Sequence, residues 1–210
     1  MNNKIHTVIF DLDGTLSDSA VLSMEAFKRI APEHGLPVPS IDKIRKATGF
    51  ATPEFYYILF PDHGRDLVKN FGTLVEQEEL LVLPSLGGKL LFEGCRELLV
   101  KLKERGIRLC MASTGDREHV VSVLDITGVA KFFDTVFCAR PDKNEMLREI
   151  IGGSDKSGCV MVGDMEKDYT AARANGIISV GACYGYCRKD FSEFDHYIYN
   201  ALDLLEILKI

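Results

Sequence analysis

The 210-residue sequence lacks the features that mark membrane proteins and nucleic-acid-binding proteins. No apolar run reaches the length that spans a bilayer, and the first residues, Met-Asn-Asn-Lys, lead into an apolar segment without a signal peptide. A net charge of -6 argues against the basic surface that binds nucleic acids. We therefore expect a cytoplasmic protein with neither a membrane nor a nucleic-acid partner. A small anionic substrate stays open, because a local cationic pocket can oppose the overall charge.

Metal-binding cysteine patterns and nucleotide-binding glycine patterns are also missing. Most of the 6 cysteines lie in apolar segments, where cysteine behaves as a small buried hydrophobic residue. Cys183 and Cys187 are close to each other, but no paired cysteine or histidine set stands nearby at zinc spacing. We expect reduced thiols without a function. The glycine fingerprints of dinucleotide and ATP sites are absent, which disfavours both ligands. The sequence leaves the oligomeric state open, and a monomer is consistent with it.

What the sequence does contain is a short apolar segment that ends in two closely spaced acids. Residues 7–10, Thr-Val-Ile-Phe, are β-branched or aromatic without alternation, as in a strand buried on both faces of a parallel sheet. Asp11 and Asp13 follow, with Gly14 for a sharp turn and Thr15 for a hydroxyl. An Asp-Gly hairpin turn is the alternative, but a capped helical pattern comes next. Because open α/β sheets place their chemistry at the carboxyl ends of strands, we expect both acids beside a crevice.

The chain divides into two kinds of pattern. Residues 18–87 predict a helical domain inserted after the first strand, because four helices between two strands far exceed an ordinary crossover. These helices are predicted at residues 20–30, 40–47, 52–60 and 64–83, with proline turns at 37–39, 61–62 and 84. Residues 1–17 and 88–210 predict an α/β core domain, with strands at 7–10, 107–112, 135–138, 159–162 and 178–182. Alternating strands and helices predict a doubly wound parallel sheet.

A second predicted strand also ends in acids. Residues 159–162 are followed by Gly163 and Asp164, and Asp168 comes four residues later on the opening turn of a helix. Positions i and i+4 share a helix face, so the two carboxylates can converge. Acids are common in any first helical turn, where they interact with the helix dipole. Two strands that both end in paired acids nevertheless favour a shared site for a hard divalent cation, and Mg²⁺ fits such oxygen ligands.

Two other segments carry polar groups at the ends of predicted strands. Ser113, Thr114 and a glycine stand between a strand and a helix, where hydroxyls and free backbone N–H groups can bind an anion. Taken alone this indication is weak, because Ser and Thr cap many helices. Arg140 and Lys143 offer two cations near the third predicted strand, and either could be a solvated surface charge.

These four segments resemble the motifs of the haloacid dehalogenase superfamily of aspartate-nucleophile phosphohydrolases. Residues 11–16, Asp-Leu-Asp-Gly-Thr-Leu, are similar to its first motif, and residues 163–168 are similar to its Gly-Asp-x-x-x-Asp motif. The second motif puts its Ser or Thr at Ser113; the next residue, often Asn in the family, is Thr114 here. The third motif is a lysine. We favour Lys143 over Arg140, because a compact ammonium suits a contact that bridges a carboxylate and a phosphate oxygen.

The resemblance implies a role for each of these residues. Asp11 would be the nucleophile that forms an aspartyl-phosphate, and Asp13 would act as acid and base. For that role Asp13 needs a raised pKa, which we expect from the acids around it. The other implied roles are Mg²⁺ binding by Asp11, the Asp13 backbone carbonyl, Asp164 and Asp168, and phosphate binding by Ser113, Thr114 and Lys143.

The resemblance also implies an architecture. The expected strand order is 5-4-1-2-3, and residues 18–87 match the helical C1 cap that closes over the site. Within this cap, the loop at Thr48 and Gly49 is the candidate for facing the substrate. Residues 181–186, Gly-Ala-Cys-Tyr-Gly-Tyr, resemble the phosphoglycolate phosphatase-like subgroup. The expected activity is hydrolysis of a small phosphorylated metabolite, with Mg²⁺ as the cofactor.

Three rival interpretations remain. A dehalogenase of the same family would share Asp11 but lacks the second acid, so Asp13 argues against it. A phosphosugar mutase would keep every motif, and the active-site residues do not separate it from a phosphatase. A non-catalytic receiver-like module also gathers acids around Mg²⁺, but it is usually much shorter and has no helical insertion. The ester itself stays open among phosphoglycolate, sugar phosphates, nucleotides and pyrophosphate, because variable cap loops decide it.

Overall fold

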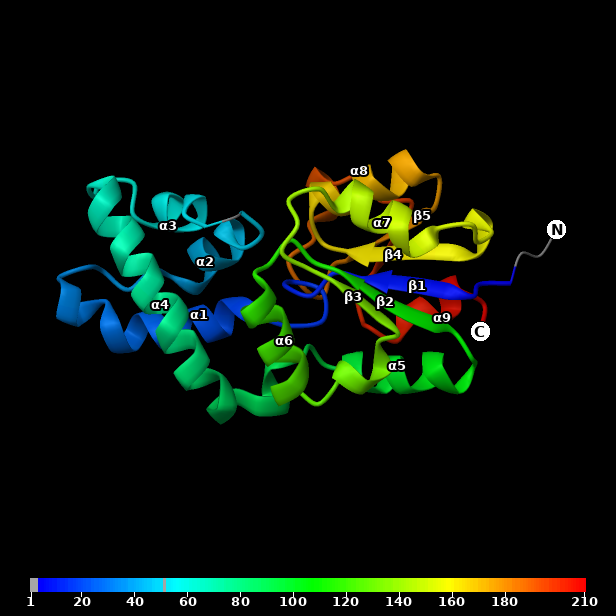
Figure 1. Cartoon of the computed structure of the whole chain (residues 1–210), viewed down its shortest axis with the longest axis horizontal. Coiled ribbons are helices and arrows are strands. Elements are labelled where there is room, and N and C mark those ends of the chain that lie inside the picture. Colours follow the sequence, from blue (N-terminus) through cyan, green and yellow to red (C-terminus); the bar gives the residue numbers. More distant parts are fainter. Residues whose placement is uncertain (1–3, 51) are drawn as a thin grey trace.

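The structure, a computed structural model that describes residues 4–50 and 52–210, is built around a parallel sheet (Figure 1). Residues 1–3, part of the predicted first segment, lie outside the described residues. Among those described, six strands run in the order β3-β2-β1-β4-β5-β6. They are β1 (Thr7–Phe10), β2 (Arg108–Ala112), β3 (Thr135–Phe137), β4 (Cys159–Gly163), β5 (Ile178–Ala182) and β6 (His196–Ile198). The predicted parallel sheet is confirmed, and its first five strands have the expected order 5-4-1-2-3.

Strand β6 was not expected and extends the sheet beyond β5. It pairs in parallel with β5, so that Val180 lies opposite His196. The carboxylate of Asp195, just before β6, accepts hydrogen bonds of 2.8 Å from the backbone N–H and the hydroxyl of Ser179. A strand of three residues, of which His196 is exposed, is too short to show a periodic pattern in the sequence.

The register of the central strands brings the polar loops to one edge of the sheet. β1 lies between β2 and β4, with Phe10 opposite Met111 on one side and Val162 on the other. All four residues of β1 are buried, which explains their unbroken apolar character. Because the three strands end side by side, the residues that follow them meet at the carboxyl edge, where Asp11 already donates its backbone N–H to the Val162 carbonyl (2.9 Å).

Helices cover both faces of the sheet, as a doubly wound fold requires. On one face α5 (Cys95–Glu104), α6 (Arg117–Ile126) and α9 (Asp203–Ile207) pack against alternate strand residues such as Val8 and Phe10. On the other face α7 (Lys143–Ile151) and α8 (Glu166–Asn175) pack against Ile9 and its neighbours. Short 3-10 helices lie at Pro32–His34, Gly87–Leu90, Ala130–Phe132, Lys156–Gly158 and Lys189–Phe191.

The segment between β1 and α5 is helical and has a hydrophobic cluster of its own. Its helices are α1 (Ser19–Ile30), α2 (Ile41–Ala47), α3 (Glu54–Leu59) and α4 (Arg65–Leu86). The cluster centres on Phe27, whose ring contacts those of Tyr56, Phe60 and Phe71. In Figure 1 the four helices lie at the left, beyond the carboxyl ends of the strands, and α4 contacts α6, one of the helices that cover the sheet. These helices therefore face the loops that follow β1 and β2, across the cavity that both line.

Two local expectations for this helical segment are wrong. Pro84 does not form a turn but lies inside α4, which continues to Leu86. Its neighbours Val82 and Leu83 are buried in the hydrophobic cluster that also contains Val8 and Phe10 of β1. The stabilisation from this burial offsets the helical hydrogen bond that a proline cannot donate. The start of α1 has no side-chain cap. The Asp18 carboxylate instead accepts hydrogen bonds from Arg45 and from the Tyr186 hydroxyl, both at 2.7 Å.

Two features of the whole chain agree with the composition. In the part of the chain that the structure describes, no helix combines the length and apolarity needed to cross a membrane. The six cysteines are all free thiols, and Cys183 and Cys187 form no disulfide. Four of the six, Cys95, Cys110, Cys159 and Cys187, are buried.

Candidate active site

The loop after β1 brings Asp11 and Thr15 against the acid that follows β4. Backbone N–H groups of Thr15 and the next two residues all donate to the Leu12 carbonyl, so the chain turns tightly. Gly14 makes this turn with φ +79, and a Cβ there would lie 2.5 Å from Oδ2 of Asp164. Only glycine fits both the conformation and the space. The Thr15 hydroxyl then donates to Oδ1 of Asp164 at 3.1 Å, which links the two acidic loops.

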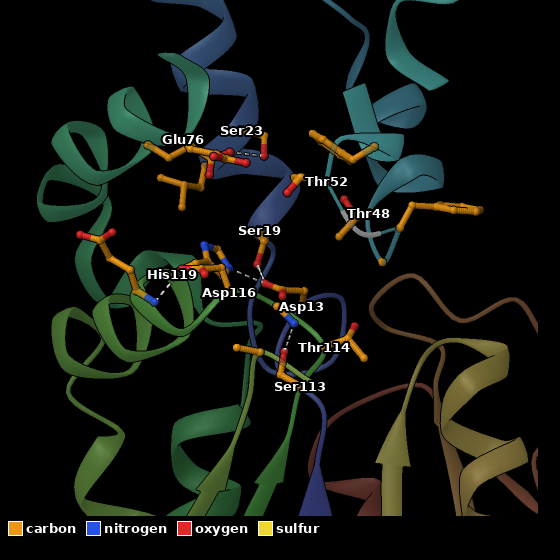
Figure 2. A pocket seen from close by; sticks show the side chains of 18 of the residues that line it. Asp13, Ser19, Ser23, Thr48, Thr52, Glu76, Ser113, Thr114, Asp116 and His119 are labelled. Atoms are coloured by element: carbon orange, nitrogen blue, oxygen red, sulfur yellow. Dashed lines mark hydrogen bonds and ion pairs between the residues drawn. The ribbon is translucent and has the colours of Figure 1, made fainter. Parts of the chain in front are cut away.

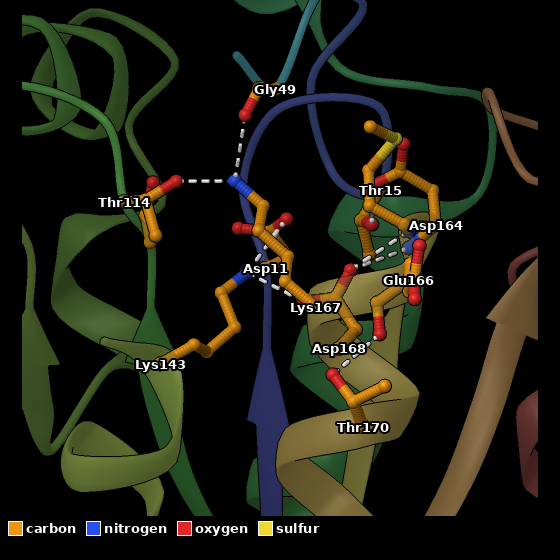
Figure 3. Close-up of polar contacts among 12 residues, drawn as sticks. Asp11, Thr15, Gly49, Thr114, Lys143, Asp164, Glu166, Lys167, Asp168 and Thr170 are labelled. Carbon is orange, nitrogen blue, oxygen red and sulfur yellow. Dashed lines mark hydrogen bonds and ion pairs between the residues drawn. The ribbon is translucent and has the colours of Figure 1, made fainter. Parts of the chain in front are cut away.

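Lys143, at the start of α7, connects the two loops by a buried ion pair with two acids (Figure 3). Its Nζ lies 2.9 Å from Oδ2 of Asp11 and 2.5 Å from Oδ1 of Asp168. The lysine is 3% exposed, so the ammonium has little access to water. Burial disfavours its charge, but the carboxylates of Asp11 and Asp168 outweigh that effect and raise the pKa of Lys143. The ammonium therefore stays charged beside Asp11.

Asp168 positions the loop after β4 as well as Lys143. Its Oδ2 accepts the backbone N–H groups of Asp164 (3.1 Å) and Met165 (2.9 Å). Gly163 makes this close approach possible, because a Cβ there would come within 2.2 Å of the Asp168 side chain. Both oxygens of Asp168 thus have protein partners, and the acid is fully buried.

Asp11, Asp164 and Asp168 form the acidic cluster that the sequence predicts. Each offers a carboxylate oxygen within 4.8 Å of the others. Three carboxylates against the single ammonium of Lys143 leave two negative charges in a buried volume. Oδ2 of Asp164 is also buried without a hydrogen-bond partner among the described residues. An oxygen-lined site with two uncompensated charges and one unpartnered oxygen fits a hard divalent cation.

The electrostatic effect of this crowding falls mainly on two of the acids. Burial raises the pKa of Asp11 to about 6, with Lys143 opposing and Asp168 adding to the shift. Burial, followed by repulsion from Asp11 and Asp168, raises the pKa of Asp164 well above its usual value. A cation bound to these oxygens would reverse both shifts, because an opposite charge favours the ionised form.

Asp13 does not join this cluster, and the expectation of a raised pKa is wrong. Its Oδ1 accepts a hydrogen bond from the hydroxyl of Ser19 and lies 2.9 Å from Nε2 of His119, on α6 (Figure 2). Burial opposes the charge of Asp13, but the charge and hydrogen bond of His119 outweigh it and lower the pKa to about 2. Burial likewise opposes the charge of His119, and Asp13 raises the pKa of that imidazole to about 9. The proton of the pair therefore rests on His119.

The loop after β2 provides a cradle of hydroxyls and backbone groups. Ser113 is 1% exposed, and its Oγ accepts the backbone N–H of Gly115 at 3.0 Å. Lys167 of α8 donates to the hydroxyl of Thr114 and, at 3.1 Å, to the carbonyl of Gly49 in the helical insertion. Lys167 also lowers the pKa of Asp11 by its charge. The cradle therefore contains a cation that the sequence analysis did not single out.

A cavity of about 650 Å³ lies between these loops and the helical insertion. Asp11, Asp13 and Ser113 line its core side, and the predicted loop residues Thr48 and Gly49 line the opposite side. This volume is within the range of roughly 300–1,000 Å³ usual for small-molecule sites. Arg140 also reaches the cavity but pairs with Glu149 (2.7 Å) near the surface, so its position differs from that of buried Lys143.

Comparison with known proteins decides the family. The profile described as haloacid dehalogenase-like hydrolase matches residues 8–182. The chain belongs to this family. The pyrophosphatase PpaX of Bacillus pumilus is 28% identical over 190 residues, which cover 87% of this chain and 85% of the relative. A phosphoglycolate phosphatase of Pseudomonas savastanoi is 27% identical over 190 residues, with coverage of 85% and 70%. A solved structure of a predicted phosphoglycolate phosphatase from Haemophilus somnus has a TM-score of 0.84 at 21% identity, covers 97% of each chain, and shares the fold.

Several groups in this haloacid dehalogenase-like site were missed by the sequence analysis. Lys167 stands inside the recognised segment 163–168, so its place beside the acids was available from the motif spacing. His119 is the third residue of α6, in its first turn, and only the direction of this helix brings it to Asp13. Glu76 and Glu79 line the cavity from α4, and no motif marks them.

Proposed function

We propose that this protein is a magnesium-dependent phosphatase that hydrolyses a small phosphate monoester through an aspartyl-phosphate on Asp11. The observation that carries the proposal is the buried contact of 2.9 Å between Asp11 Oδ2 and Lys143 Nζ at the inner end of the cavity. Through this contact Lys143 fixes one oxygen of the Asp11 carboxylate, and its ammonium lies where it could also bind the phosphate oxygens of a substrate. The names of the relatives, a phosphoglycolate phosphatase and a pyrophosphatase, support phosphate transfer to water.

In the first step, a carboxylate oxygen of Asp11 attacks phosphorus while the bond from phosphorus to the alcohol oxygen breaks. Lys143 and Lys167 offset the negative charge on the phosphate oxygens, and Ser113 and its neighbouring N–H groups orient them. The leaving oxygen takes a proton from the Asp13–His119 pair. Oδ1 of Asp13 contacts His119, and its Oδ2 lies near Gly115 on the phosphate side, where a Cβ would come within 3.3 Å. The carboxyl group thus connects the proton on His119 with the leaving group.

In the second step, water replaces the alcohol. Asp13, now without the proton it delivered, removes a proton from the water, whose oxygen attacks phosphorus and releases Asp11 and inorganic phosphate. The Asp13–His119 pair then holds a proton again, as it did at the start. We expect the helical insertion to act as the cap that excludes bulk water during the first step.

The residues at the acidic cluster fit a bound Mg²⁺. Asp11 and Asp164 would hold it with their side chains, together with the Asp13 backbone carbonyl, and Asp168 would lie beside it while orienting Lys143. Bound there, the cation would supply charge neutralisation between the Asp11 carboxylate and the incoming phosphate. The cation would also provide a partner for the buried Oδ2 of Asp164, which has no hydrogen-bond partner among the described residues.

The test is phosphate release from p-nitrophenyl phosphate and from small alkyl phosphates, with Mg²⁺ or with EDTA. We expect turnover that EDTA and Asp11→Asn each abolish, and mass spectrometry of acid-quenched protein to find a phosphoryl group on the Asp11 peptide. Asp62→Asn, an exposed turn residue outside the cavity lining, is the matched control and should retain activity. Activity that survives Asp11→Asn would contradict the proposal. Conversion of glucose 1-phosphate to its isomer without phosphate release would identify a mutase instead.

A further inference from the structure

The side of the cavity formed by the helical insertion carries acids close to the catalytic groups. Glu76 (labelled in Figure 2) and Glu79, one turn apart on α4, both line it. Oε1 of Glu79 accepts a hydrogen bond of 2.6 Å from the hydroxyl of Ser23, which fixes the carboxylate. Glu79 lines the same cavity as Asp13 and His119, the pair that supplies the proton to the leaving alcohol.

The cations of the cavity are all on the other side. Among the described lining residues, the positively charged groups are His119, Arg140 and Lys167, and each comes from the α/β core. Each also has an acidic or polar partner there: Asp13, Glu149 and Thr114, respectively. The described lining residues of the insertion include two glutamates and neither lysine nor arginine. The lysine and arginine of the described lining thus lie at the phosphate end, together with acids of the core, whereas the leaving-group end carries two carboxyl groups and neither of these cations.

Aromatic rings complete the leaving-group end. Phe50, Phe55 and Tyr56 line it together with the two glutamates. The phenol of Tyr56 lies close enough to them that, after burial, the charges of Glu79 and Glu76 raise its pKa further. Carboxylates and aromatic faces are the two groups that attract an ammonium in a partly dry site.

We propose that the substrate is the phosphate ester of an amino alcohol or amino sugar, whose ammonium group binds between Glu76, Glu79 and the aromatic rings. This proposal rests on the proposed phosphatase function and names the substrate class of the same site. An anionic leaving group such as that of phosphoglycolate would instead place a carboxylate against two glutamates. Like charges juxtaposed in an interface are strongly unfavourable, and the described insertion lining offers no cation to offset them.

The test compares three esters of similar size that differ in the charge of the leaving group: aminoethyl phosphate, hydroxyethyl phosphate and phosphoglycolate. We expect kcat/KM to fall in that order, by about tenfold at each step, which corresponds to roughly 1.4 kcal/mol per charge change. An amino sugar phosphate should likewise exceed the matching neutral sugar phosphate. Phosphoglycolate equal to or better than aminoethyl phosphate would overturn the proposal.

Two variants separate charge recognition from folding. Glu76→Gln with Glu79→Gln should reduce the differences in kcat/KM among the three esters to within about threefold. Glu78→Gln is the control, because Glu78 lies on the same helix but pairs with Arg29 and is not part of the cavity lining. Glu78→Gln should keep the wild-type order and spacing of kcat/KM for the three esters. If the double variant does not fold, the wild-type order of esters still decides the matter.

The same assay distinguishes this proposal from the proposed function. If p-nitrophenyl phosphate and all three small esters are inert with Mg²⁺, the phosphatase function itself fails. If p-nitrophenyl phosphate is hydrolysed and phosphoglycolate is the preferred small ester, only the choice of substrate class fails.

Discussion

Nε2 of His119 lies 2.9 Å from Oδ1 of Asp13, and this contact joins helix α6 to the loop after β1. It lies away from the buried cluster of Asp11, Asp164 and Lys143. The site therefore separates two tasks in space. One set of charges holds the nucleophile and the metal ligands, and the other stores the proton that the leaving alcohol needs. A carboxylate that shares a proton with an imidazole can pass it on without itself being protonated at rest.

His119→Gln should slow hydrolysis most for esters whose alcohol is a poor leaving group. Glutamine can still donate to Asp13 but carries no transferable proton, so we expect kcat for an alkyl phosphate to fall about 100-fold. Release of p-nitrophenolate in the first turnover should fall by less than about threefold, because that anion leaves without protonation. Stopped-flow absorbance and phosphate release measure the two quantities. Equal losses for both esters would show that His119 only positions Asp13.

Lys143 and Arg140 should differ sharply when each is replaced by methionine. Lys143→Met leaves two buried carboxylates without their ammonium, so we expect activity to fall by at least about 100-fold and the free energy of unfolding to fall by about 3 kcal/mol. Arg140→Met removes an exposed pair with Glu149 and should change either quantity little. Steady-state kinetics and urea unfolding of both variants decide between them. A larger loss of activity for Arg140→Met would reverse the assignment of the third-motif cation.

The parts of the site that could be predicted from the sequence are those fixed by strand ends. Asp11, Ser113 and Asp164 each follow a buried strand directly, and parallel register brings three such ends together whatever the surrounding packing. The order of the first five strands came instead from the resemblance to the haloacid dehalogenase superfamily, and the observed strand pairing agrees with it. Lys143 was a choice between two cations, and its burial beside Asp11 is what separates it from Arg140.

The remaining parts depend on packing that no local pattern encodes. Helix α4 carries acids at several positions, and only its orientation over the core determines that Glu76 and Glu79 face the cavity while Glu78 pairs with Arg29. The pKa of Asp13 was mispredicted for a related reason. Nearness to other acids in sequence suggested repulsion, but the side chain points to His119. The pKa of Asp13 is lowered because its side chain points to His119, and the spacing of acids in the sequence does not reveal that direction.

Removal of the metal should affect stability as well as activity. At a Mg²⁺ concentration of about 100 times its Kd, binding adds about 2.7 kcal/mol, and we expect the Tm to rise by several degrees above its value in EDTA. Asp164→Asn should abolish this rise. In EDTA the same variant should be at least as stable as wild type, because it replaces a buried carboxyl whose charge is disfavoured and whose Oδ2 has no hydrogen-bond partner among the described residues. Differential scanning calorimetry of wild type and Asp164→Asn, each with Mg²⁺ and with EDTA, measures the four Tm values. A Mg²⁺-dependent rise that persists in Asp164→Asn would exclude this acid as a ligand.

Glu79 should make the stability of the fold depend on pH in a defined window. Burial raises the pKa of its carboxyl from 4.5 to about 7, with His119 opposing the shift. The folded state therefore binds this proton more tightly than the unfolded state does. The stabilisation is fully present below pH 4.5 and is lost as the pH rises toward 7, after which it stays constant.

Glu79→Gln removes this dependence because glutamine does not titrate. Relative to wild type, the variant should therefore gain about 1–2 kcal/mol in free energy of unfolding between pH 5 and pH 8. Urea unfolding at the two pH values, without Mg²⁺, measures the change. Glu78→Gln, on the same helix but paired with Arg29, should show no such gain. If Glu79→Gln shows the same pH dependence as wild type, the carboxyl titrates near its usual value. The cavity around it would then be wetter than its burial and its bond to Ser23 imply.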